Sequence, residues 1–131
     1  MISVIIPAYN EEATIQRCLS ALSHQTIPRS SYELIVVDGN SSDRTREIAA
    51  DYADLVFIQE SERVPGARND GFARAKYPIV ATTDADRIAA PDWIEHILHS
   101  FKDPAVVLAF GPVTAIEDTQ KTGAMSCCSI S

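Results

Sequence analysis

Two aspartates with a single residue between them are the clearest candidates for chemistry in this sequence. Asp84 and Asp86 follow an apolar run over 78–83. Two carboxylates at this spacing, just past a strand, can converge on one hard cation, and Mg²⁺ or Mn²⁺ accepts oxygen ligands while leaving positions open for phosphate. The alternative is a pair of solvated loop aspartates, because the chain holds ten aspartates and such a pair can arise by chance. The position after a buried run favours a metal site.

Asp38 and Arg68 are the next candidates. Asp38 ends another apolar run, directly before Gly39, and could accept a hydrogen bond from a base or a ribose. Its alternative role is that of a turn or cap residue. The Arg68 guanidinium could meet phosphate or ribose oxygens. Its alternative is a solvated ion pair with Glu62 or Asp70, and the pattern alone favours that alternative.

A third group, Asp92, His96 and His99, recurs at helical spacing on one face. Such a group could bind a metal, but the opposite face carries Trp93 and other large apolar residues. An amphipathic helix with a solvated polar face is therefore the expected reading.

Alternating apolar runs and amphipathic segments predict the elements that position these residues. Strands are predicted at 3–6, 34–37, 55–58, 78–83 and 106–110, and helices follow each of the first four. Asn10 is predicted to cap the first helix, and Ser42 or Asp43 the second. The third helix is predicted to begin at Pro65, and the fourth to have Pro91 at its first helical position.

Strands that alternate with helices predict an α/β fold, with a mainly parallel sheet and helices on both faces. Ligands of such sheets bind at the carboxyl ends of the strands. Tyr9 and Asn10, Asp38, and the pair Asp84 and Asp86 all fall at that edge.

Composition and missing motifs narrow the class of protein. The net charge of -7, from 18 acidic and 11 basic residues, argues against nucleic-acid binding. No glycine-rich dinucleotide fingerprint and no Walker-type phosphate loop is present, which argues against a dehydrogenase or an NTPase. The three cysteines show no disulfide or zinc spacing, and no membrane-spanning run or signal peptide is visible. We expect a cytoplasmic protein, and a peripheral contact at the inner face of the membrane is compatible with the sequence.

Four segments together resemble family 2 glycosyltransferases of the GT-A fold, which have a Rossmann-like nucleotide-binding half. The segments are Val4-Ile5-Ile6-Pro7-Ala8-Tyr9-Asn10-Glu11-Glu12, Val36-Val37-Asp38-Gly39-Asn40-Ser41-Ser42-Asp43-Arg44-Thr45, Gly66-Ala67-Arg68-Asn69-Asp70-Gly71 and Thr83-Asp84-Ala85-Asp86. They occur in family order, and the resemblance covers residues 1–112. Asn40-Ser41-Ser42 departs slightly from the family, where Ser-Thr is more usual.

The resemblance implies a role for each matching residue. Pro7, Ala8 and Tyr9 would line the nucleoside pocket, with Glu12 near the ribose or base. Asp38 would accept a hydrogen bond from the nucleobase, and Arg68 would lie near the nucleobase or the diphosphate. Asp84 would lie nearest the ribose and the metal, and Asp86 would be the principal ligand of Mn²⁺ or Mg²⁺. The donor would be a UDP- or GDP-sugar.

The resemblance also implies transfer with inversion, which requires a carboxylate to take the acceptor proton. The family places that base farther from the aspartate pair than this chain extends, so no catalytic base is assigned. Glu117 and Asp118 are too close to match. We therefore expect a donor-binding domain over 1–112 and a tail over 113–131 that is partly disordered or an incomplete acceptor region. Uncovered apolar surface would favour a homo-oligomer.

Two other functions compete with this interpretation. One is a non-catalytic nucleotide-sugar-binding module or truncated fragment, which the missing base supports. The other is nucleotidyltransfer, which would need a glycine-rich basic loop after the first strand, and that loop is absent.

Overall fold

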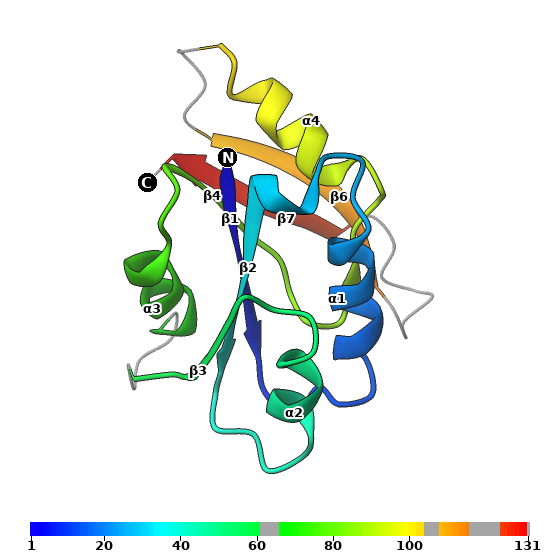
Figure 1. The fold of residues 1–131 in the computed structure, drawn as a ribbon, viewed down its shortest axis with the longest axis vertical. Coiled ribbons are helices and arrows are strands. Elements are labelled where there is room, and N and C mark those ends of the chain that lie inside the picture. The colour runs from blue at the N-terminus through cyan, green and yellow to red at the C-terminus, as the bar shows by residue number, and fades with distance from the viewer. Residues whose placement is uncertain (61–65, 104–107, 116–123, 131) are drawn as a thin grey trace.

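The computed structural model describes residues 1–60, 66–103, 108–115 and 124–130. Its strands form one sheet in the order β3-β2-β1-β4-β7-β6-β5 (Figure 1). Four strands run parallel: β1 (Ile2–Ala8), β2 (Tyr32–Asp38), β3 (Leu55–Ile58) and β4 (Ile79–Thr82). The predicted α/β class and mainly parallel sheet are confirmed.

Helices cover both faces of the parallel strands. They are α1 (Ile15–Ser23), α2 (Thr45–Ala49), α3 (Gly66–Arg74) and α4 (Trp93–Ser100), with a 3₁₀ turn, η1, at Arg29–Ser31. Alternate residues of each strand enter opposite cores, because successive side chains of a strand point to opposite faces. Val4 and Ile6 pack with α1 and α4, whereas Ile5 packs on the side of α3. This double coverage explains the continuous apolar runs.

The far side of the sheet differs from the expectation of parallel strands. Next to β4 lie β7 (Ala124–Ile130), β6 (Leu108–Ala115) and β5 (Arg87–Ile88), and all three pairings are antiparallel. The predicted strand 106–110 corresponds to β6. No strand was predicted within 113–131, yet β7 lies between β4 and β6. Which strands pair, and in which direction, depends on contacts between residues far apart in sequence. A short apolar run does not contain that information.

Three predicted helix starts need correction. Asn10 does not cap α1: its φ is 51°, in the left-handed region, and the helix begins at Ile15. The cap of α2 is Arg44 instead of Ser42 or Asp43, although the Asp43 carboxylate accepts from the Thr45 backbone N–H. Helix α4 begins at Trp93, two residues after Pro91. The Asn10 side chain instead accepts a hydrogen bond from the Ser42 N–H in the loop after β2.

Candidate functional site

The loops that follow β1, β2 and β4 meet at the carboxyl edge of the sheet. Ala8 and Asp38, the last residues of β1 and β2, are partners in register, and the Gly39 N–H donates to the Ala8 carbonyl at 2.8 Å. On the other side of β1, Ile5 pairs with Thr82, the last residue of β4. The predicted site residues are therefore brought to one edge, as the parallel order requires.

Asp84 and Asp86 project from one tight turn. The Arg87 N–H donates to the Asp84 carbonyl at 3.2 Å, and Ala85 between the two aspartates is buried. The side chains of Asp84 and Asp86 are 49% and 48% exposed. Two half-exposed carboxylates on one turn fit a hard divalent cation that also takes ligand oxygens. Within the described residues no group of three or more His, Cys, Asp or Glu side chains is gathered for a metal.

Cys18 supports this turn from behind. The Cys18 thiol, on α1, lies within 3.5 Å of the Asp84 carbonyl oxygen and can donate to it. Burial raises the pKa of the Cys18 thiol to about 12, and the neighbouring carboxylates add to that rise. The thiol therefore stays protonated and acts as a weak donor. Sequence reasoning assigned Cys18 no part in the site, because the contact joins residues 66 positions apart.

Each aspartate of the pair also faces an arginine. Arg68 on α3 approaches Asp84 with a distance of 2.8 Å between Nη2 and Oδ1. Arg87 approaches Asp86 with 3.5 Å between Nε and Oδ1. The predicted alternative partners of Arg68 were Glu62, which lies outside the described residues, and Asp70, which accepts from the Glu60 N–H. Arg68 thus joins the site, and Arg87 is a member that the sequence analysis missed.

Asp38 is fully buried and is held by internal donors. Its carboxylate accepts from the Ser41 backbone N–H at 2.7 Å, from the Ser41 hydroxyl at 2.5 Å and from Arg46 Nη1 at 2.7 Å. These bonds fix the loop that follows β2. A nucleobase could donate a hydrogen bond to Asp38 only by sharing the carboxylate with these donors or by replacing one of them.

Side-chain hydrogen bonds fasten the loops after β1 and β2 to each other. The Asn10 N–H donates to the Ser41 hydroxyl at 2.8 Å, and Asn10 Oδ1 accepts from the Ser42 N–H at 2.9 Å. The Glu11 N–H donates to Thr45 Oγ1 at 2.9 Å. The left-handed backbone of Asn10 turns its amide toward this neighbour, which explains why Asn10 caps no helix.

The other residues predicted to bind the nucleoside, from Pro7 to Glu12, lie at the end of β1 and in the loop that follows it. Pro7 is half-buried and Ala8 buried within β1, and Tyr9 after them is 61% exposed. Glu12 accepts from the Arg44 N–H at 3.1 Å through Oε2. Tyr9 is thus exposed at the carboxyl edge, and Glu12 helps to hold the neighbouring loop.

The face of α4 is solvated as expected. Trp93, Ile94 and Ile97 are buried, whereas His96 and His99 are exposed. His96 lies 3.5 Å from Asp92, four positions earlier in the chain.

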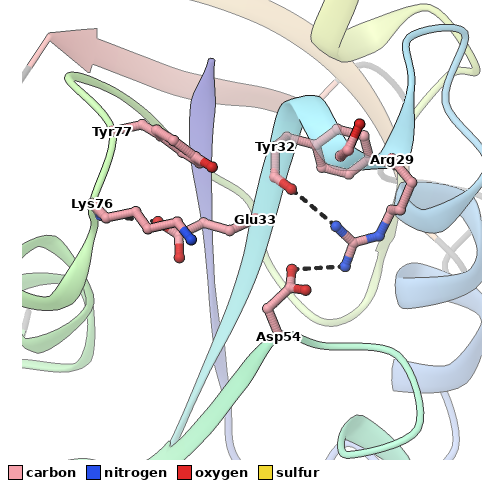
Figure 2. Close-up of a pocket in the computed structure, with 7 residues that line it drawn as sticks. Arg29, Tyr32, Glu33, Asp54, Lys76 and Tyr77 are labelled. Carbon is pink, nitrogen blue, oxygen red and sulfur yellow. Dashed lines mark hydrogen bonds and ion pairs between the residues drawn. The ribbon is translucent and has the colours of Figure 1, made fainter.

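A hollow lies at the opposite, amino edge of the parallel strands (Figure 2). Its walls are Arg29, Ser30, Tyr32, Glu33, Asp54, Lys76 and Tyr77. Arg29 pairs with Asp54 at 2.7 Å, and the buried Glu33 accepts from the Ser3 hydroxyl and the Lys76 N–H. These bonds stabilise the starts of the strands. The residues predicted to bind a ligand lie instead at the carboxyl edge, where folds of this kind bind theirs.

Similarity to known proteins identifies the family. A profile described as glycosyl transferase family 2 matches residues 3–126. The chain belongs to glycosyl transferase family 2. It is 36% identical over 118 residues to glycosyltransferase AglE of Haloferax volcanii, covering 86% of this chain and 39% of that relative. It is 35% identical over 111 residues to validoxylamine A glucosyltransferase of Streptomyces hygroscopicus subsp. limoneus, covering 80% of this chain and 24% of the relative.

Solved structures of similar proteins agree with the fold. The mannosyltransferase PcManGT from Pyrobaculum calidifontis, in complex with GDP-Man and Mn²⁺, superposes with a TM-score of 0.75 and 28% identity over 82% of this chain and 34% of that one. S. aureus TarS 1-349 in complex with UDP-GlcNAc gives 0.72 and 26% identity over 82% and 32%. The chain thus spans less than half of the relatives named here, and the predicted family and GT-A fold are confirmed.

Proposed function

We propose that this chain is the donor-binding part of an inverting glycosyltransferase that holds a nucleoside-diphosphate sugar through a divalent metal. The observation that carries the proposal is the single turn after β4 that presents Asp84 and Asp86 half-exposed at the carboxyl edge. The similarity to PcManGT, whose structure contains GDP-Man and Mn²⁺, supports the same class of ligand here.

The nucleoside is proposed to bind between the loops after β1 and β2. Pro7, Ala8 and the exposed Tyr9 ring would line its pocket, and aromatic rings stack readily on bases. Glu12 would lie near the ribose or base. Asp38 would accept from the base by sharing a lone pair that its internal donors leave open, which makes its hold on Ser41 part of the same task.

The diphosphate is proposed to bind near Arg68, Asp84 and Asp86. Asp86 would be the principal metal ligand, with Asp84 nearest the ribose and metal. Either Mn²⁺ or Mg²⁺ suits the carboxylate oxygens. Once bound, the metal would neutralise charge on the leaving diphosphate. Arg68 would add a second positive charge at the same place.

In the proposed reaction an acceptor hydroxyl attacks the anomeric carbon, and the bond to the diphosphate oxygen breaks with inversion. A carboxylate must take the hydroxyl proton, and none is assigned to this role. Glu117 and Asp118, both set aside as bases on spacing, lie outside the described residues. The division into a donor domain over 1–112 and a tail over 113–131 stays a proposal.

Calorimetry with UDP and GDP, each with and without Mn²⁺, tests donor binding. We expect one nucleotide to bind only with metal present, and Asp86→Asn to weaken that binding about 10- to 100-fold. Absence of binding by both nucleotides in Mn²⁺ would refute the donor site.

A turnover assay on the same protein separates two functions. Release of UDP or GDP from a nucleotide sugar indicates an enzyme. Binding without release would indicate the alternative, a non-catalytic nucleotide-sugar-binding module.

We also propose a location and an assembly state. No helix within the described part of the chain is long and apolar enough to cross a membrane. A cytoplasmic location, with peripheral contact at the inner membrane face, suits the class of donor. Strand β3 forms one edge of the described sheet, and an uncovered edge favours a homo-oligomer, which analytical ultracentrifugation would detect.

A further inference from the structure

Arg87 is more deeply buried than Arg46 and Arg68, the other arginines that pair with aspartates of the site. Its backbone belongs to β5 and pairs with Ala115 of β6. Its side chain is only 17% exposed, and Nη1 is buried with no hydrogen-bond acceptor among the described residues. A buried guanidinium N–H without an acceptor is costly, so it favours any rearrangement that supplies one.

The contact between Arg87 and Asp86 is electrostatic more than directional. The separation of 3.5 Å between Nε and Oδ1 is too long for a strong hydrogen bond. The 2.8 Å contact of Arg68 with Asp84 is a close one. Asp86, the proposed principal metal ligand, is therefore the less tightly held of the two carboxylates.

The two aspartates of the turn and the two arginines paired with them carry no net charge together. Two carboxylates and two guanidiniums sum to zero while no ligand is bound. A divalent cation alone would leave two uncompensated positive charges beside the arginines. A nucleoside-diphosphate sugar carries about two negative charges, one on each phosphate, so cation and donor together restore neutrality.

We propose that Arg87 is an internal counter-ion of Asp86 that opposes metal uptake until a nucleoside diphosphate arrives with the metal. When a divalent metal is bound, Asp86 would hold it in place of the Arg87 guanidinium. Arg87 then pairs with phosphate oxygens, which supply its missing acceptor. Arg68 makes the same exchange at Asp84. Arg87 is a positioning residue that couples metal and donor binding, and this role rests on the proposed donor function.

Titration of Mn²⁺ without nucleotide, followed by electron paramagnetic resonance of the free ion, tests the first step. We expect Arg87→Met to bind Mn²⁺ about three- to tenfold more tightly, because a competing cation is gone. Arg87→Lys keeps the charge and should stay close to the original protein. Arg74→Met is the control, since it removes an arginine that pairs with Glu60 outside the site.

The same titration with UDP or GDP present tests the coupling. Each ligand must strengthen the other by one common factor, because binding free energies are reciprocal. We expect that factor to fall about three- to tenfold in Arg87→Met and to stay unchanged in Arg74→Met.

The outcomes separate the two proposals. A protein that binds neither nucleotide with Mn²⁺ refutes the donor function and this inference with it. A protein that binds both, with unaltered or weaker Mn²⁺ affinity in a folded Arg87→Met, refutes the inference alone. Circular dichroism checks folding, and Arg87→Gln replaces the methionine variant if that variant unfolds, with the same expectation.

Discussion

Thr45 lies at the start of α2 with its side chain fully buried. Its hydroxyl donates to the Asp43 carboxylate and accepts from the Glu11 N–H, so one oxygen joins the loops after β1 and β2. The Thr45 hydroxyl is the main cause that lowers the pKa of Asp43, and backbone N–H donors from Thr45 and Glu12 contribute. At this scale a buried threonine sets the shape of the proposed nucleoside pocket.

Thr45→Val should raise the pKa of Asp43 toward its ordinary value, which carboxyl ¹³C NMR would measure. A lowered pKa stabilises the folded protein above the unfolded value of about 3.9, and that stability is lost as pH falls through the folded pKa. The variant should therefore lose less stability between about pH 5 and pH 2 than the original protein.

The same variant should also unfold more easily at pH 7, by about 1–2 kcal/mol, because the Glu11 N–H loses its acceptor. Thr26→Val is the control, since Thr26 bonds to Glu95 at an exposed position. An unmoved Asp43 titration would contradict the assignment.

Helix α3 lies very close to β1, and a glycine allows that approach. A Cβ atom at Gly71 would come within 2.3 Å of Ile5 Cγ2. Glycine lowers helix propensity, so Gly71 is locally unfavourable within α3. The packing explains its presence, because the helix that carries Arg68 rests on the sheet at this point.

Gly71→Ala should destabilise the domain by about 1–3 kcal/mol, because the added methyl overfills the contact. Helix propensity alone predicts the opposite sign, a gain of about 1 kcal/mol. Ala73→Gly, on the exposed side of the same helix, measures the propensity effect without the packing. Urea unfolding of both variants decides between them, and a stabilised Gly71→Ala would show that α3 does not pack so closely.

At the scale of the whole molecule, the proposed ligand bridges loops that follow three strands of one sheet. Its binding should therefore stabilise the folded domain as a unit. The loops after β1 and β2 are already joined by hydrogen bonds, and Cys18 joins α1 to the turn after β4. Ligand binding to the folded state alone raises its stability by mass action.

At a nucleotide concentration 100-fold above Kd with Mn²⁺, we expect about 2.7 kcal/mol of added stability and a rise in Tm of about 5–10 °C. EDTA should abolish the rise. Asp86→Asn should show little of it, whereas the Arg74→Met control should show all of it. A rise that survives EDTA would mean that the nucleotide binds without the metal.

Much of the architecture was predictable because its signals are local. Runs such as residues 34–37 are apolar at every position, which indicates strands covered on both faces. Alternation with helices then requires the loops after Tyr9, Asp38 and Asp84 to share one edge. The four motifs also indicated the family, which the family profile confirmed.

The tertiary structure decided features that depend on residues distant in sequence. It paired Arg68 with Asp84, set Cys18 beneath the turn and turned Asn10 toward Ser42. It also inserted β7 antiparallel beside β4. Periodicity and motif spacing describe neighbours along the chain, so they establish which residues face a core or end a strand. Which charged group meets which carboxylate is set by packing across the sheet, and only the folded chain defines it.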